Sequence, residues 1–145
     1  MKKLALPIRF GIAISGCLIA YFLVLALFNL HTNPLYSLFN SVITGFGIYE
    51  AIKAYKLRQE EQFNYINGFK IGLIAGTVAT AVFTVFFAFY STELNPSFYT
   101  DTMAKLSMDS SVGLVIFAVG MLGIATTVII TLTLMQLFKP SNNLA

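Results

Sequence analysis

The segment from residue 71 to residue 90 holds no charged side chain, and it is one of four apolar stretches in a chain of 145 residues. A helix of about 20 apolar residues is long enough to cross a hydrocarbon core of about 30 Å. Over the whole chain 57% of residues are hydrophobic and 10% are charged, and the mean hydropathy is +0.80. A water-soluble domain of this length could not bury so much apolar surface. The sequence therefore predicts an all-α membrane protein.

The four apolar stretches predict a four-transmembrane-helix bundle that forms a single domain, residues 1–145. The expected spans are residues 8–30, 35–53, 68–90 and 112–138. The second span is the most polar, because it includes Asn40, Thr44 and Glu50 as well as two serines. Such a helix is expected to face its neighbours more than lipid.

The connection between the third and fourth spans predicts a short helix of its own. Asn95 and Pro96 are typical of an N-cap and a first helical residue. The residues that follow place Phe98, Tyr99 and Met103 on one helical face. We expect this helix to lie in the outer membrane–water interface.

The distribution of basic residues predicts the orientation of the chain. Of the nine lysines and arginines, only Lys105 lies in the predicted outer connection. The other eight fall on the side of the two termini and the middle connection: Lys2, Lys3, Arg9, Lys53, Lys56, Arg58, Lys70 and Lys139. Cytoplasmic segments carry the excess of lysine and arginine, so both termini are expected in the cytoplasm. The predicted location is the bacterial cytoplasmic (inner) membrane, with several passes.

Small residues recur at helical spacing on three of the predicted spans. On the third span they return at every fourth position, which forms a narrow stripe where another backbone can approach closely. The fourth span carries its small residues at heptad spacing, ending at Thr127. The predicted helix-packing residues are Gly68, Gly72, Gly76 and Thr80, then Ser37, Ser41 and Gly45, and finally Gly113 and Gly120. The spacing leaves open whether these stripes pack within one chain or between chains.

Glu50 is an ionisable side chain well inside a predicted span. A carboxylate at this depth is a candidate functional group, because an unpaired charge at the bilayer centre costs at least ~2.5 kcal/mol. Lys53 lies one turn away, and Lys70 is expected at the same level on the next helix. Two interpretations stay open: an ion pair that joins the second and third helices, or an ion- or proton-coupling site.

Other chemistry-bearing groups are few. Cys17 and His31 are the single cysteine and the single histidine, so we expect no metal site and no cofactor. No nucleophile, base and acid set is apparent, which predicts no catalytic residue and no enzyme. The basic residues predict topology and no nucleic-acid binding.

Cys17 also allows a different interpretation of the first span. Met1-Lys2-Lys3, an apolar stretch and Ser15-Gly16-Cys17 are similar to a bacterial lipoprotein signal. However, Arg9 interrupts the apolar region, and cleavage before Cys17 would leave 13 apolar residues, too few to cross a membrane. We expect an intact first span, and modification of Cys17 is left open.

The junction from Phe63 to Gly72 reads Phe-Asn-Tyr-Ile-Asn-Gly-Phe-Lys-Ile-Gly. With Asn64 as a cap followed by Phe69, Lys70 and Gly72, it resembles the uncharacterised bacterial four-helix membrane proteins grouped as domain of unknown function 4199. The resemblance extends to the first turn, residues 31–35, and to the Pro-Ser-Phe start of the outer segment at residue 96. It implies the fold, the topology and a bacterial cell-membrane location. That family has no assigned activity, so the resemblance implies no catalytic residue.

Two functions are compatible with these patterns. The first is a non-enzymatic structural or accessory subunit of a membrane assembly, in contact with the lipid bilayer and with copies of itself or a larger membrane-protein partner. The alternative is a small transporter, or a transporter subunit, that uses Glu50 near the cytoplasmic side.

Overall fold

The computed structural model of the chain describes residues 2–30, 33–59, 63–106 and 110–139. These residues are helical apart from short connections, which confirms the predicted all-α class. This part of the chain forms five α-helices and one π-helical turn: α1 (Lys2–Leu27), α2 (Pro34–Gln59), α3 (Tyr65–Phe89), the π-helical turn η2 (Tyr90–Leu94), α4 (Pro96–Leu106) and α5 (Val112–Leu137).

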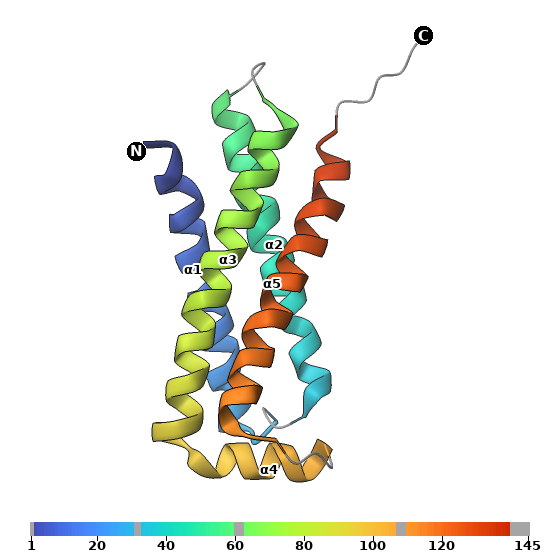
Figure 1. Cartoon of the computed structure of the whole chain (residues 1–145). Helices are drawn as coiled ribbons and strands as arrows, with labels where there is room; N and C mark the ends of the chain where they lie inside the picture. The colour runs from blue at the N-terminus through green and yellow to red at the C-terminus, as the bar shows by residue number, and fades with distance from the viewer. Residues whose placement is uncertain (1, 31–32, 60–62, 107–109, 140–145) are drawn as a thin grey trace.

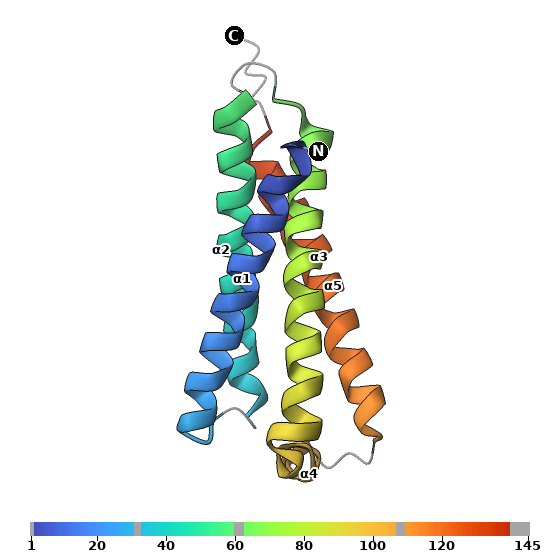
Figure 2. The same cartoon turned by 90° about the vertical axis from the view of Figure 1, so that its left-hand side faces the viewer.

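The four long helices lie side by side in an elongated arrangement, and α4 lies across one end of it (Figure 1). The start of α1, the end of α2, the start of α3 and the end of α5 lie at the opposite end (Figure 2). We call this opposite end the basic end, because the arginines and lysines of residues 2–9, 53–70 and 139 belong to it. The helix α3 contacts α1, α2 and α5 and is the central element.

Three of the described helical segments are long and apolar enough to cross a membrane: Ala5–Leu27, Tyr65–Leu94 and Val112–Leu137. The helix α2 is as long, at 26 residues, but its polar side chains lower its hydropathy. Length and composition therefore support three of the four predicted spans.

The ends of the helices follow local chain chemistry. The first helix ends at Leu27, three residues before the predicted end of its span, because Asn29 adopts a left-handed conformation with φ of 55°. The amide of Leu30 donates to the Leu25 carbonyl at 2.9 Å and that of Asn29 to Ala26 at 3.1 Å, which is a Schellman motif. In the predicted turn that follows, His31 and Thr32 lie outside the described residues.

The predicted cap of the third helix is confirmed. The side chain of Asn64 accepts a hydrogen bond of 2.8 Å from the amide of Ile66. The start of the transverse helix is also as predicted, since Pro96 is its first residue. The helix α5 begins after Ser111, whose side chain accepts from the amide of Leu114 at 3.3 Å.

An aromatic cluster holds α4 against the end of the long helices. Phe22 of α1 lies at its centre and makes edge-to-face contacts, with ring centroids 4.9–6.2 Å apart. Its partners come from α3, η2 and α4: Phe83, Phe86, Phe87, Tyr90 and Phe98. This geometry is favoured by aromatic quadrupoles. The π-helical turn, which the sequence did not predict, ends α3 next to this cluster.

A second, aliphatic core joins α1, α2 and α3 nearer the basic end. Its fully buried side chains on α2 are Ile48, Ala51 and Ile52. Two glycines allow the close approach of the backbones there. A Cβ atom on Gly11 would lie 2.7 Å from the Ala75 carbonyl oxygen, and one on Gly47 would overlap Ile14.

Candidate functional site

The predicted stripe of α3 packs within the chain, against α5. Gly68, Gly72, Gly76 and Thr80 are all buried. A Cβ atom on Gly72 would lie 2.5 Å from Cγ2 of Thr131, and one on Gly76 would overlap Thr127. Real Cβ atoms essentially never approach another heavy atom below 3.0 Å. Each of these glycines therefore accommodates one threonine of the facing helix.

The roles of the two helices exchange farther from the basic end. There the threonine belongs to α3 and the glycine to α5. A Cβ atom on Gly123 would lie 2.5 Å from Cγ2 of Thr80, and one on Gly120 would lie 3.6 Å from Thr84. We call these four contacts the glycine–threonine ladder: Gly72 with Thr131, Gly76 with Thr127, Thr80 with Gly123, and Thr84 with Gly120.

Several hydroxyl groups of the ladder are buried without a hydrogen bond. The Oγ1 atoms of Thr84, Thr127 and Thr131 have no partner among the described residues. An exposed threonine of the same helix, Thr133, instead donates to the Ile129 carbonyl at 2.9 Å. The Oγ1 of Thr127 would lie 2.6 Å from a Cβ atom on Gly76, so it faces the glycine backbone, where only weak Cα–H contacts are available.

The remaining predicted packing residues lie in looser surroundings than the glycines of the ladder. Gly113 is exposed, and a Cβ atom there would meet nothing within 4 Å. On α2, Ser37 is exposed and Ser41 is half-buried, while a Cβ atom on Gly45 would lie 3.7 Å from Ile130 of α5. The predicted α2 stripe is displaced because this helix buries Thr44, Ile48, Ala51, Ile52 and Tyr55 instead.

The candidate ionic group is confined to one helix. Lys53 Nζ and Glu50 Oε1 lie 3.5 Å apart on α2, with 46% and 35% of their side chains exposed. Lys70 of α3 is exposed, and no ion pair joins it to Glu50, both of which the structure describes. The expected ion pair between Glu50 of the second helix and Lys70 of the third is therefore absent. The ion pair that does form, between Glu50 and Lys53, joins two residues three positions apart on the surface of α2.

A shallow, open cleft of about 470 Å³ lies at the basic end, on α2 beside the C-cap residue of α5. Its lining residues are Tyr49, Lys53, Lys56, Leu57 and Phe138. Both lysines lie over aromatic rings: Lys53 Nζ is 5.6 Å from the Tyr49 centroid, and Lys56 Nζ is 5.6 Å from that of Phe138 and 5.7 Å from that of Phe63. The sequence pattern did not predict this cleft, although its two lysines lie three residues apart on one helical face.

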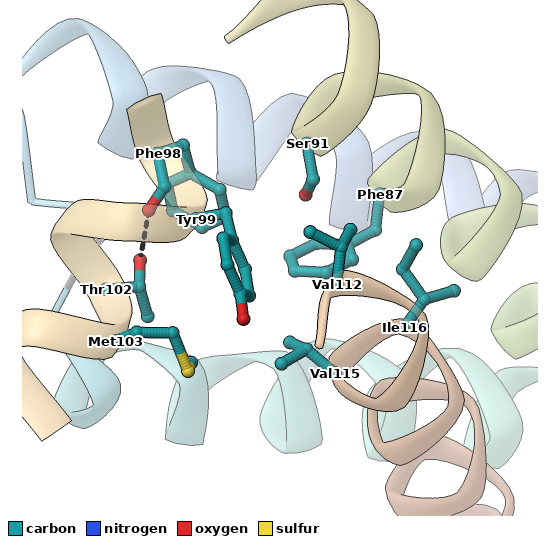
Figure 3. Close-up of a pocket in the computed structure, with 9 residues that line it drawn as sticks. All are labelled: Phe87, Ser91, Phe98, Tyr99, Thr102, Met103, Val112, Val115 and Ile116. Carbon is teal, nitrogen blue, oxygen red and sulfur yellow. Dashed lines mark hydrogen bonds between the residues drawn. The ribbon is translucent and has the colours of Figure 1, made fainter. Parts of the chain in front are cut away.

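A much smaller cavity, of about 20 Å³, lies where η2 and α4 meet α3 and α5 (Figure 3). The hydroxyl of Ser91 is buried at its edge without a hydrogen bond. The nearby Thr102 hydroxyl is already used, because it donates to the Phe98 carbonyl at 2.7 Å. This volume suits one water molecule and excludes an organic ligand.

The described residues contain no group of three or more histidine, cysteine or carboxylate side chains that could hold a metal ion. Cys17 lies in α1 with its side chain exposed on the outside of the helix arrangement.

Comparison with known proteins identifies a family. The family model described as "Protein of unknown function (DUF4199)" matches residues 9–113. The chain belongs to this family. The match confirms the resemblance carried by Asn64, Phe69, Lys70 and Gly72, all of which lie inside the matched range. No curated protein matches the chain, and no solved structure does.

The DUF4199 match begins within α1, at residue 9, includes α2 to α4 and ends at the second residue of α5. The α3 half of the glycine–threonine ladder thus lies inside the matched residues, and its α5 half lies outside them. The DUF4199 description names no activity.

Proposed function

We propose that this DUF4199 protein crosses the bacterial cytoplasmic membrane four times, with both termini in the cytoplasm. Two observations support a fourth crossing by α2. It lies beside the three helices that are apolar enough to span, and the first charged residue among its 26 residues is Glu50, so residues 34–49 carry no charge. The concentration of lysine and arginine at the basic end supports a cytoplasmic position for that end.

Cysteine labelling tests this topology. In a Cys17→Ser background, Leu35→Cys and Arg58→Cys place single thiols at opposite ends of α2, at exposed positions. A membrane-impermeant maleimide applied to spheroplasts should label the first position directly and the second only after permeabilisation. Equal labelling of both positions in intact spheroplasts would show that α2 does not cross.

We further propose that the protein is a non-enzymatic structural or accessory subunit of a membrane assembly. The observation that carries this proposal is the glycine–threonine ladder, which brings α3 and α5 together at fitted positions over residues 72–84 and 120–131. Such contacts leave little room for a substrate or for a path between these helices. They produce a rigid scaffold, which suits a protein that positions or stabilises others.

The partner of this scaffold is a larger membrane protein or further copies of the chain. A tagged protein extracted from its native membrane in mild detergent, with native mass and co-purifying proteins measured by mass spectrometry, tests the proposal. A stoichiometric partner or a defined homo-oligomer is expected. A monomer that co-purifies with nothing, and that catalyses flux when reconstituted alone, would contradict it.

The alternative of a transporter that uses Glu50 receives less support. A coupling carboxylate is expected to face the bundle interior or a water-filled cavity. Glu50 instead pairs with Lys53 on the surface of α2, with about a third of its side chain exposed.

A further inference from the structure

We propose that the cleft at the basic end, on α2 beside the C-cap residue of α5, binds the phosphate group of an anionic phospholipid from the surrounding bilayer. The cleft combines two lysines with aromatic side chains at the end of the helices. The proposal rests on the membrane insertion proposed above, but it does not depend on which protein partner is found.

The cleft carries positive charge from two lysines. Lys53 Nζ forms an ion pair with Glu50 Oε1 at 3.5 Å, whereas Lys56 has no ion pair within the described residues. The cleft-lining residues therefore carry two positive charges, of which Glu50 balances one. Lysine ammonium groups bind phosphate as compact point charges. Basic pockets between membrane helices on the cytoplasmic side bind anionic lipid headgroups in other membrane proteins.

The aromatic rings hold the ammonium groups in position. Lys56 Nζ lies over the neighbouring rings of Phe63 and Phe138, whose centroids are 6.4 Å apart, and Lys53 Nζ lies over Tyr49. The Tyr49 and Phe138 rings are themselves in contact, with centroids 5.5 Å apart. Cation–π contacts of this kind keep a lysine side chain over the protein surface. The two charges are thus held beside the cleft before a ligand arrives.

The surface next to the cleft suits acyl chains. Tyr49 is followed toward the bundle centre by Phe46 and Val42, at spacings of three and four residues on the same helical face. These two side chains are 68% and 64% exposed. A lipid whose phosphate lies at Lys53 and Lys56 would place its chains along this apolar stripe. A soluble phosphate ester would make no use of it, so we assign the site to a lipid.

The test is native mass spectrometry of the purified, detergent-solubilised chain titrated with phosphatidylglycerol and, separately, with phosphatidylcholine. We expect one retained phosphatidylglycerol and much weaker retention of phosphatidylcholine. Lys53→Gln with Lys56→Gln should weaken phosphatidylglycerol binding roughly thirtyfold, given the contribution of each lysine near an anionic surface. Lys53→Arg with Lys56→Arg should preserve binding, since arginine keeps the charge and the ring contacts.

The matched control is Arg9→Gln with Lys70→Gln. It removes two exposed charges from the same end of the molecule, on α1 and α3. An equal loss of binding in this control, or unchanged binding in the glutamine variant of the cleft, would overturn the site. Melting temperatures of the variants show whether a loss of lipid binding is due to unfolding. If the glutamine variant is unfolded, the arginine variant provides the test, because a folded arginine variant that fails to retain phosphatidylglycerol would overturn the site.

Two further outcomes would also overturn the proposal. Equal retention of phosphatidylcholine would show that the headgroup charge is not recognised. Displacement of the lipid by glycerol 3-phosphate at similar concentration would show a site for soluble phosphate esters. Failure of lipid binding together with recovery of a protein partner in the pull-down would remove this inference alone and leave the proposed function intact.

Discussion

Gly72 on α3 and Thr131 on α5 fit together so closely that a Cβ atom on the glycine would lie 2.5 Å from the threonine Cγ2. Gly72→Ala should therefore destabilise the protein by about 1–3 kcal/mol, the usual cost of overpacking. Thr131→Ser removes Cγ2 and leaves Oγ1 at 3.1 Å and Ile48 Cγ2 at 3.2 Å as the nearest neighbours. The double variant should recover part of the loss in a double-mutant cycle of unfolding free energies in detergent.

The control for this cycle is Gly113→Ala, because a Cβ atom there would meet nothing within 4 Å. Its unfolding free energy should stay the same or rise by up to about 1 kcal/mol, the difference in helix propensity. Additive effects of Gly72→Ala and Thr131→Ser would mean that the two residues do not touch.

Thr127→Val should leave the protein as stable as before or stabilise it. Its hydroxyl is buried without a hydrogen bond, and valine keeps the shape while removing that group. An unsatisfied buried hydroxyl lowers the unfolding free energy by about 1–3 kcal/mol, and its removal avoids this cost. Thr133→Val is the matched control on the exposed side of α5. A clear destabilisation by Thr127→Val would indicate that its hydroxyl has a partner in the membrane.

Phe22→Ala should cost about 3–5 kcal/mol, because it removes a buried ring from the centre of the aromatic cluster. The same change should expose α4, whose Phe98 packs on that ring at 5.7 Å between centroids. Faster maleimide labelling of Met103→Cys in a Cys17→Ser background reports the exposure, because Met103 is half-buried where α4 meets α5. Phe117→Ala is the control, since its ring is 67% exposed. Unchanged labelling would mean that α4 is held by other contacts.

Asn64→Ala should lower the unfolding free energy by about 1 kcal/mol, the typical value of an N-cap. The lost contact is the 2.8 Å hydrogen bond from the Ile66 amide. Asn67→Ala, at an exposed position inside the same helix, should have no such cost. If both variants melted alike, the cap would contribute nothing.

Glu50→Gln should change the unfolding free energy by no more than about 1 kcal/mol, as expected for an exposed ion pair. Lys53 has a ring contact with Tyr49 that does not depend on the carboxylate. Assembly with a partner should also be unaffected. A large loss of stability, or loss of proton-coupled flux in reconstituted vesicles, would indicate a functional role for Glu50.

Local chemistry made several elements predictable. Asn64 and Pro96 act through their own backbone neighbours, so the sequence was sufficient to place two helix starts. The α3 stripe was also visible, because four-residue spacing identifies one helical face. Its partner was not, since spacing identifies a face and not the helix that covers it. Gly123, Thr127 and Thr131 repeat every four residues on α5 and could have suggested the match with α3.

Other features needed the three-dimensional arrangement. Whether Glu50 meets Lys70 depends on the rotation of α2 about its axis, which a polar helix with a weak pattern leaves undetermined. Gly11 and Gly47 are isolated in sequence, and their close contacts appear only when α1 is packed on its neighbours. Ser37 and Gly113 have the same residue types as the packing positions but lie where no helix covers them.

The exchange of glycine and threonine between α3 and α5 gives the pair of helices a single axial alignment. If α5 slid by one turn in one direction, Gly76 would meet Gly123 and leave a gap. A slide of one turn in the other direction would bring Thr80 against Thr127, two branched side chains where one fits. A uniform row of glycines on one helix would accept all three positions. The mixed row is incompatible with two of these positions. A newly inserted α5 can therefore dock on α3 only at the position where each glycine meets a threonine.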